Sequence, residues 1–252
     1  MQEHPYFHCD GVKVLAHRGG LDPLENTIEA FQKALSAGAN YIETDVRTSK
    51  DGVALLFHDE DLIRLTGLKR KIKDLTLEEI KTLELSPGLF IPTLAEAFEK
   101  LPNAKFNLDL KDEQSVQSAV KEIELHQAHS RVLVSSFSER RRLSAIKSLS
   151  KPVATSTSSA LVLKLWLIYV LNLPKSLMSR ILKDVGAVQI PVRFRVLRLD
   201  SKAFIGFLLS SGTEVHFWSI NDPKQMLKLT SLGASGIITD VPELAVQTLR
   251  KA

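Results

Sequence analysis

Residues 14–61 contain VLAHRGG (14–20), ENTIEAFQKAL (25–35), YIETDV (41–46) and GVALLFHDED (52–61). Of the whole chain, this stretch indicates the fold most clearly. Its apolar spacing predicts a strand, a helix and two further strands, in this order. Alternate side chains of a strand point to opposite faces, so the two acids of YIETDV share one face. Neighbouring carboxylates repel each other, and their burial becomes favourable when a cation lies between them. This stretch therefore predicts a cation site near the end of a strand.

Apolar runs typical of strands recur along the whole chain, with helical apolar spacing between them. The predicted strands are 12–16, 41–46, 105–110, 132–135, 153–155, 187–190, 214–218 and 236–239. The predicted helices are 26–37, 94–101, 113–126, 139–149, 160–171, 201–211, 223–232 and 242–250. This alternation implies parallel strands joined by crossover helices, and the chain length suits a closed TIM (β/α)8 barrel. An open, doubly wound sheet is the alternative fold.

Residues 52–92 interrupt this regular alternation. They contain an extra strand at 53–57, an amphipathic helix at 76–85 and a turn at Pro87 and Gly88. We therefore predict a single domain, 1–252, with this segment as a small insertion after the second strand. In a barrel such an insertion leaves from the rim where the strands end, which is the face that carries catalytic chemistry.

Residues suited to catalysis stand at or just beyond the ends of several predicted strands. They are His17, Arg18, Glu43, Asp45, His58, Asp109, Lys111 and Trp218. The alternation in NLDLKD brings a third acid beside the first two, and three carboxylates favour Mg²⁺ or Ca²⁺ over Zn²⁺. The two cationic side chains suit an anionic phosphoryl group, and the two histidines suit acid and base catalysis on a phosphate ester.

Each of these residues also has a purely structural interpretation. Glu43 and Asp45 could pair with Arg18 and Lys111 in an ionic network without a metal. The histidines could be a buried structural residue and part of a turn, and the tryptophan could belong to the core. Their joint placement on one rim favours a functional site, because independent structural causes would scatter them.

Motifs spread over nearly the whole chain carry a family resemblance. They are AHRG (16–19), ENT (25–27), ETDV (43–46), FHD (57–59), IPTLAEAF (91–98), NLDLK (107–111), VHFWSIND (215–222) and GIITDVPE (236–243). In these motifs, and in their order, the chain resembles the glycerophosphodiester phosphodiesterases. The resemblance implies a TIM barrel with a small insertion after the second strand. It also implies metal-dependent hydrolysis of glycerophosphodiesters to sn-glycerol 3-phosphate and an alcohol.

The resemblance also implies a role for each candidate residue. Glu43, Asp45 and Asp109 would bind a divalent cation, His17 and His58 would form the general acid/base pair, Arg18 and Lys111 would contact phosphate, and Trp218 would wall the glycerol pocket. Many members have Glu where this chain has Asp109, which withdraws the carboxylate by about one methylene. Two other functions stay open, namely lysophospholipase D activity on lysophospholipids and a barrel that only binds phosphoryl ligands.

Composition limits the partners and the location. The net charge of +4 suits anionic small molecules but is too small to predict nucleic-acid binding. Cys9 is the one cysteine, and the N-terminal residues show no basic start followed by an apolar run. We therefore expect no signal peptide and a cytoplasmic protein.

The stretch ALVLKLWLIYVLNL (160–173) is unusually apolar but too short to span a bilayer, which needs about twenty residues. One interpretation is a barrel helix that a neighbouring element buries. The other is an apolar lip near the mouth that holds acyl chains or rests on an anionic membrane, with contact through residues 160–182. Nearby Lys164, Lys175 and Arg180 would then assist binding.

Overall fold

A computed structural model describes residues 4–21, 24–194 and 196–250, and eight parallel strands form its main sheet. They are β1 (Lys13–His17), β2 (Tyr41–Thr48), β6 (Lys105–Leu110), β7 (Val132–Ser135), β8 (Ala154–Thr155), β9 (Ala187–Pro191), β12 (Glu214–Trp218) and β13 (Gly236–Thr239). Their order is β8-β7-β6-β2-β1-β13-β12-β9, and a parallel bridge between Ser156 and Ala187 joins the two end strands. The predicted TIM barrel is confirmed, and the open sheet is wrong.

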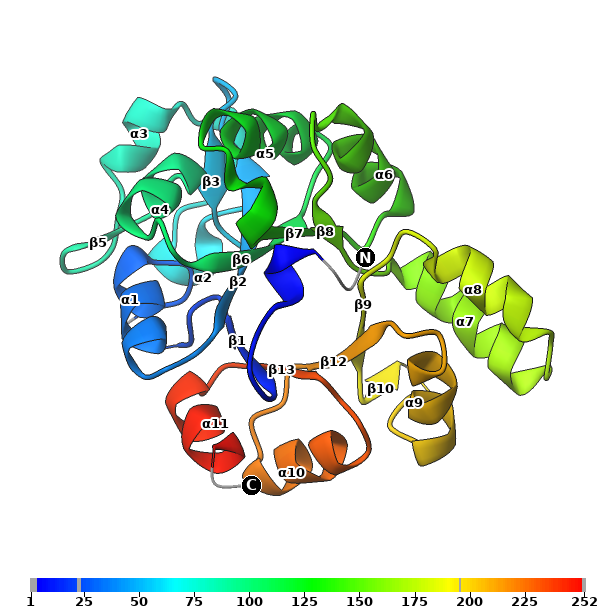
Figure 1. The fold of residues 1–252 in the computed structure, drawn as a ribbon. Coiled ribbons are helices and arrows are strands. Elements are labelled where there is room, and N and C mark those ends of the chain that lie inside the picture. Colours follow the sequence, from blue (N-terminus) through cyan, green and yellow to red (C-terminus); the bar gives the residue numbers. More distant parts are fainter. Residues whose placement is uncertain (1–3, 22–23, 195, 251–252) are drawn as a thin grey trace.

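Helices surround this barrel on the outside (Figure 1). They are α1 (Ile28–Ser36), α4 (Leu94–Lys100), α5 (Gln114–Leu125), α6 (Glu139–Ser148), α7 (Ser159–Val170), α8 (Lys175–Leu182), α9 (Lys202–Leu209), α10 (Pro223–Ser231) and α11 (Pro242–Leu249). Local chemistry sets several of their starts: the Thr27 hydroxyl accepts from the Ala30 amide, and Asp222 caps α10 before Pro223. The main apolar core lies between these helices and the outer face of the strands.

The insertion contains β3 (Ala54–Leu56), which pairs antiparallel with β2, and short elements beyond it. These are α2 (Ile63–Thr66), η2 (Ile72–Asp74), α3 (Leu77–Lys81), β4 (Glu84–Ser86) and β5 (Leu89–Phe90). A small apolar cluster that includes Phe57, Leu62 and Ile80 holds them together. The predicted helix at 76–85 is too long, because its last residues pair with β5 across the turn at Pro87 and Gly88.

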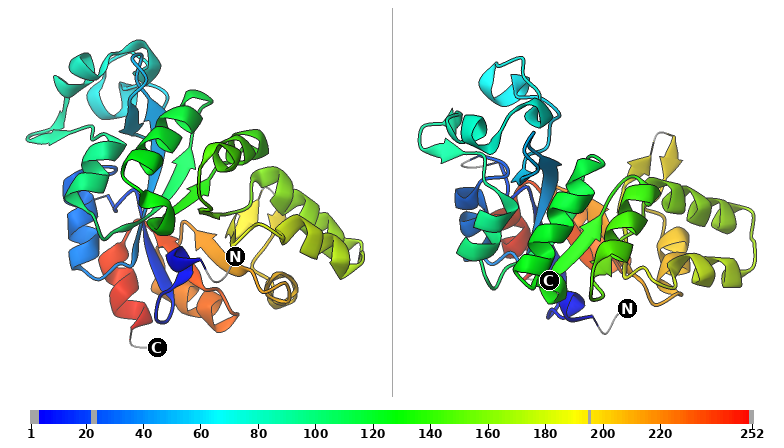
Figure 2. Two further views of the ribbon diagram at one scale, coloured as in Figure 1. Left: turned by 45° about the horizontal axis from the view of Figure 1, so that its top comes forward. Right: turned by 90° about the horizontal axis from the view of Figure 1, so that it is seen from above.

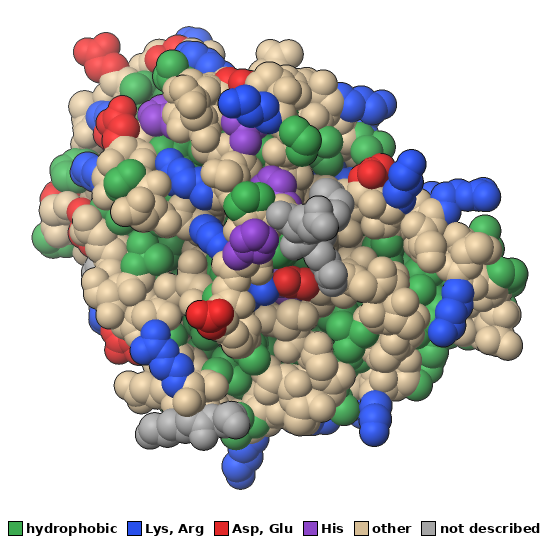
Figure 3. All heavy atoms as spheres, in the orientation of Figure 1, with side chains coloured by type: hydrophobic (Ala, Val, Ile, Leu, Met, Phe, Trp, Pro, Cys, Tyr) green, Lys and Arg blue, Asp and Glu red, His purple; other side chains and the backbone are tan. Residues whose placement is uncertain are grey.

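The two ends of the barrel differ. At the amino ends of the strands, η1 (Pro5–Phe7) closes the interior: Tyr6 is fully buried, and its carbonyl accepts from the Tyr41 hydroxyl at 2.8 Å. Figures 1 and 3 look onto this end, where acidic and basic side chains are interspersed. In the right-hand view of Figure 2, the insertion rises on the opposite side of the barrel from η1.

Two further features project from the barrel. Helices α7 and α8 form an antiparallel pair that extends outward (Figures 1 and 2). A hairpin of β10 (Arg193–Phe194) and β11 (Leu197–Arg198) rises beside them on the same side as the insertion. The sequence indicated α7 but not this hairpin. None of the described helices combines the length and the apolar character needed to cross a bilayer.

Candidate active site

A cavity of about 320 Å³ opens at the carboxyl ends of the barrel strands. All eight candidate residues predicted from the sequence line it: His17, Arg18, Glu43, Asp45, His58, Asp109, Lys111 and Trp218. They come from four strands, the loops after them and the insertion. The barrel therefore assembles in one pocket residues that are separated by up to about two hundred positions in the chain.

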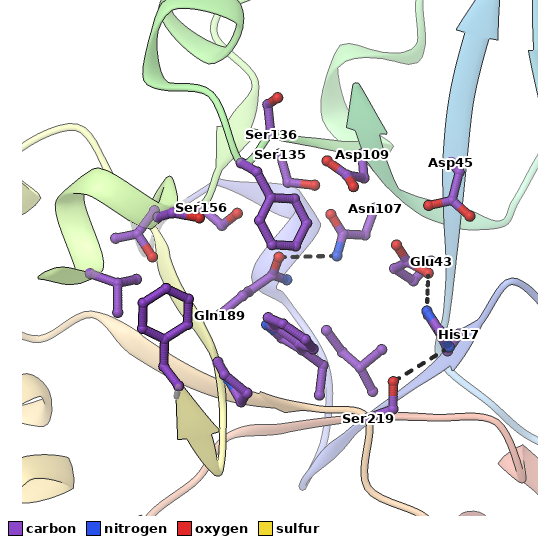
Figure 4. A pocket seen from close by; sticks show the side chains of 18 of the residues that line it. His17, Glu43, Asp45, Asn107, Asp109, Ser135, Ser136, Ser156, Gln189 and Ser219 are labelled. Atoms are coloured by element: carbon purple, nitrogen blue, oxygen red, sulfur yellow. Dashed lines mark hydrogen bonds and ion pairs between the residues drawn. The ribbon is translucent and has the colours of Figure 1, made fainter. Parts of the chain in front are cut away.

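Strand register places the polar residues beside one another. His17 at the end of β1 is the register partner of Glu43 in β2. Asp45, two residues further along β2, is the register partner of Asp109 in β6. Figure 4 shows Glu43, Asp45 and Asp109 on the same side of the pocket, with His17 next to Glu43. The pairing of β1 with β2 and of β2 with β6 thus brings the three acids and one imidazole together, because register partners on neighbouring parallel strands point to the same face.

Two cationic side chains lie among these acids. The Lys111 Nζ is 2.8 Å from Asp45 Oδ1 and 2.7 Å from Asp109 Oδ2. The Arg18 Nε is 3.1 Å from Asp45 Oδ2, and its Nη1 donates to Glu25 Oε1 at 3.1 Å. The ionic network considered from the sequence is therefore present. It holds both cations at the pocket wall, where an anionic ligand can reach them.

The three acids differ in how far nearby positive charge offsets the effect of burial on their pKa values. Burial raises the pKa of Glu43 to about 7, and nearby Asp45 adds to this rise although His17 opposes it. Burial also raises the pKa of Asp109. For Asp45 the effect of burial is outweighed by Lys111 and Arg18, which lower its pKa. For Glu43 and Asp109, burial therefore outweighs the effect of the positive charge nearby.

This donor set fits a divalent cation in its chemistry. Three buried carboxylates supply the hard oxygen ligands that Mg²⁺ and Ca²⁺ prefer, and the raised pKa values of Glu43 and Asp109 indicate a need for more positive charge. Over the described residues, no three His, Cys, Asp or Glu side chains stand in a group that could hold a metal ion. Lys111 instead bridges Asp45 and Asp109.

Both pocket histidines have Nδ1 bound to a carboxylate. The His17 Nδ1 donates to Asp240 Oδ1 at 2.5 Å, and the His58 Nδ1 donates to Asp59 Oδ1 at 2.7 Å. Burial lowers the pKa of His17, but Glu43 and the bond to Asp240 outweigh it, so its pKa is raised. Each bond fixes the ring orientation and leaves Nε2 as the nitrogen that can exchange a proton with a ligand.

Asp240 was not among the candidate residues predicted from the sequence. It directly follows β13, and its Oδ2 also accepts from Asn221 Nδ2 at 2.7 Å. Its position just past a strand end is the same signal that identified the other acids, so the sequence contained the information. Asn107 and Gln189 also line the pocket, and their side chains bond to each other at 3.2 Å. Nothing in the sequence indicated this contact between β6 and β9.

The pocket continues beyond the charged residues as an apolar arm. Its walls are Phe137, Val162, Leu163, Trp166, Phe194, Leu197, Leu199 and Trp218. The rings of Phe137 and Trp218 meet edge to face, with centroids 5.9 Å apart. The arm therefore places a mainly apolar surface directly beside the acids and histidines, and α7 and the β10–β11 hairpin supply much of it.

Comparison with known proteins agrees with this geometry. The sequence profile of the Glycerophosphoryl diester phosphodiesterase family matches residues 17–244, which include every residue of the polar cluster. The chain belongs to this family. As an enzyme of the family it is a phosphodiesterase, so a barrel without catalytic activity is not the right interpretation.

Individual relatives support the assignment to the family. "Probable glycerophosphodiester phosphodiesterase 2" of Mycobacterium tuberculosis is 36% identical, over 91% of this chain and 88% of its own length. "Lysophospholipase D GDPD1" of Homo sapiens is 28% identical, over 91% of this chain and 83% of its own length. A solved phosphodiesterase structure from Oleispira antarctica, in complex with the product sn-glycerol-3-phosphate, has a TM-score of 0.78 and 26% identity. It covers 96% of this chain and 98% of that chain.

Proposed function

We propose that this phosphodiesterase hydrolyses glycerophosphodiesters to sn-glycerol 3-phosphate and an alcohol, with His17 and His58 as its general acid/base pair and a divalent cation as cofactor. The observation that carries the proposal is the pair of carboxylate-bound imidazoles that line one pocket with a buried cluster of acids and cations. The named activities of the family members and the product-bound relative support the substrate class.

The cation would be held by Glu43, Asp45 and Asp109. When bound, Mg²⁺ or Ca²⁺ supplies positive charge that neutralises the phosphodiester. The chain's own contribution is a buried set of oxygen donors whose raised pKa values at Glu43 and Asp109 reflect charge not compensated by the protein. Asp109 is one methylene shorter than the Glu of many family members, so experiment must decide between Mg²⁺ and Ca²⁺.

Arg18 and Lys111 are the proposed phosphate contacts. Both are anchored by carboxylates at the pocket wall, so their charges are already oriented before a substrate arrives. The two histidines then divide the proton transfers: one Nε2 takes the proton from the attacking oxygen, and the other gives a proton to the leaving alcohol. The bonds from Nδ1 to Asp240 and Asp59 keep both rings in the tautomer that this exchange requires.

The test is turnover of glycerophosphocholine by histidine variants. His17→Ala and His58→Ala should each lower kcat by about 100-fold or more, because each removes one proton-transfer partner. The matched control is His8→Ala, which changes an exposed histidine directly after η1, at the amino ends of the strands. Near-normal kcat in a folded His17 or His58 variant would remove that residue from the proposed chemistry.

Metal dependence is tested separately. The protein stripped with a chelator should lose turnover and regain it with Mg²⁺ or Ca²⁺. Calorimetric titration of the stripped protein should show divalent binding that Glu43→Gln and Asp109→Asn both weaken, without reference to activity. Full turnover in excess chelator, with no heat of metal binding, would contradict the proposed cofactor.

A second candidate substrate is a lysophospholipid, as in the related lysophospholipase D. The apolar arm favours it, because an acyl chain can lie against Trp166, Phe194 and Leu197 while the phosphate meets the acids. Paired assays of glycerophosphocholine and lysophosphatidylcholine separate the two substrates. Trp166→Ser should lower kcat/KM for the lysophospholipid by about tenfold and leave the glycerophosphodiester nearly unchanged. Equal loss on both substrates would refute a role for the arm in binding acyl chains.

A further inference from the structure

Large apolar side chains are exposed around one side of the pocket mouth. We call this surface the apolar lip, and it consists of Leu163, Leu167, Val170, Leu171, Leu173, Leu177, Phe194 and Val196. The first six residues belong to α7, α8 and the loop between them, and the last two belong to the β10–β11 hairpin. Single exposed apolar residues need no explanation, but a continuous group beside a binding pocket indicates an interaction surface.

The lip is continuous with the apolar arm of the pocket. On α7, Leu163 and Trp166 line the pocket, and Leu167 and Val170 extend the same helical stripe away from it. On the hairpin, Phe194 lines the pocket. An apolar path therefore runs from the catalytic cavity to the outer surface without interruption by an acidic residue of α7.

The rest of α7 is already packed. Leu165 and Ile168 are buried, and the Tyr169 ring lies against Phe204 of α9 with centroids 5.2 Å apart. Helix α8 packs against α7 and buries Met178. The interpretation of 160–173 as a barrel helix that a neighbouring element buries thus agrees with the structure for one side of α7 only. The other side, toward the mouth, stays exposed.

The two parts of the lip also project beyond the barrel wall. In the right-hand view of Figure 2 the α7–α8 pair extends sideways, and the β10–β11 hairpin rises on the same side of the barrel as the insertion. Val196, between the hairpin strands, is 93% exposed, and Leu171 at the end of α7 is 62% exposed. Exposed apolar side chains on two projecting elements can both insert into the interfacial region of a lipid bilayer.

The segment of the chain that carries the lip is strongly basic. Lys164, Lys175, Arg180 and Arg193 are exposed, and Asp184 is the one acidic residue between positions 159 and 198. This local excess of basic residues is complementary to an anionic surface.

We propose that the apolar lip and its basic residues dock this protein on an anionic lipid bilayer. The apolar side chains enter the boundary between headgroups and acyl chains, and Lys164, Lys175, Arg180 and Arg193 contact the anionic headgroups. The pocket mouth then opens onto the interface, so an amphiphilic phosphodiester reaches the site while its acyl chain stays in an apolar environment. The docking itself is independent of the proposed metal and of the proposed histidine chemistry.

The test is co-sedimentation with unilamellar vesicles of phosphatidylglycerol and phosphatidylcholine, compared with vesicles of phosphatidylcholine alone. The wild type should bind the anionic vesicles at least about tenfold more tightly, and added salt should weaken this binding. The double variant Leu167→Glu/Val196→Glu should lower the affinity by about tenfold or more, since it puts acids at two lip positions that do not line the pocket.

Controls separate docking from folding and from catalysis. Leu125→Glu places one such charge at an exposed leucine at the end of α5 and should bind vesicles like the wild type. Both variants should keep the wild-type circular dichroism and the wild-type kcat/KM on soluble glycerophosphocholine. No vesicle binding by the wild type, equal binding to both vesicle types, or equal loss in Leu125→Glu would overturn the proposal. A lip-dependent dimer in light scattering, without vesicle binding, would overturn it in favour of a second copy of the chain.

Discussion

A buried ion pair at the closed end of the barrel offers a sharp test of what holds this fold together. The Lys13 Nζ lies 2.8 Å from Glu214 Oε1, and both side chains are largely buried. The fully buried His216 donates from Nε2 to the other oxygen, Glu214 Oε2, at 2.8 Å. We predict that Lys13→Met destabilises the protein, because it leaves the Glu214 carboxylate buried with one of its two partners removed.

The expected magnitude is about 3 kcal/mol, at the low end for a broken buried pair because Glu214 keeps its bond to His216. For a chain of this size that corresponds to a fall of roughly 6–12 °C in the unfolding midpoint near pH 7. Adding Glu214→Gln to Lys13→Met should recover most of the loss, since the uncompensated charge is then gone. Thermal unfolding followed by circular dichroism measures all three proteins.

The sign of the pH dependence follows from Glu214. Burial tends to raise its pKa, but the bond from His216 and the charge of Lys13 outweigh burial, so its pKa is lowered. Its ionised form therefore stabilises the fold above its unfolded pKa of about 4.5, and this stability is lost as the pH falls through the folded pKa. Lys13→Met raises the folded pKa, so the difference from the wild type should be largest near neutral pH and shrink in acid.

A matched control uses an exposed pair of nearly equal length. Lys71 Nζ lies 2.7 Å from Glu60 Oε1, and both side chains are about half exposed. Lys71→Met should leave the midpoint unchanged within error, because water already solvates both charges. The reasoning about burial is refuted if Lys71→Met costs as much as Lys13→Met, or if the double variant at positions 13 and 214 is no more stable than Lys13→Met.

Two other predictions follow from the geometry. Asp240→Asn should lower kcat by about tenfold or more in a glycerophosphodiesterase assay, because the carboxylate that orients His17 is lost; an unchanged kcat would show that this bond is not needed. Gly186→Ala should destabilise the protein by about 1–3 kcal/mol in denaturant unfolding, because the new methyl group would lie 2.3 Å from the buried Phe7 ring. Gly206→Ala, in a helix and with open space around it, should instead stabilise by about 0.5–1 kcal/mol, and the opposite order would contradict this packing argument.

The fold and the polar half of the site could be predicted because their signals are local. Each barrel strand is a short apolar run between helical patterns, and the bounds of β6, β7, β12 and β13 agree with the prediction. A strand's alternation decides which side chains share a face, and a parallel barrel brings all strand ends to one rim. Glu43, Asp45 and Asp109 could therefore be grouped without coordinates.

Other features depended on contacts between segments that are distant in the sequence. The helix at 76–85 was predicted too long, because pairing between β4 and β5 competes with the helical periodicity after Lys81. The β10–β11 hairpin is too short to give an alternation signal. The bridging position of Lys111 between Asp45 and Asp109 depends on side-chain conformation, which no spacing rule specifies.

The sequence by itself determined the barrel, the family and the set of residues that meet at its mouth, because strand periodicity and chain order are enough to bring them to one rim. Only the tertiary structure decided which partner each charge has and which side of α7 is covered. Those outcomes depend on strand register and on packing against distant elements such as α8 and α9. The exposed stripe that remains on α7 is the surface that we propose for docking on a membrane.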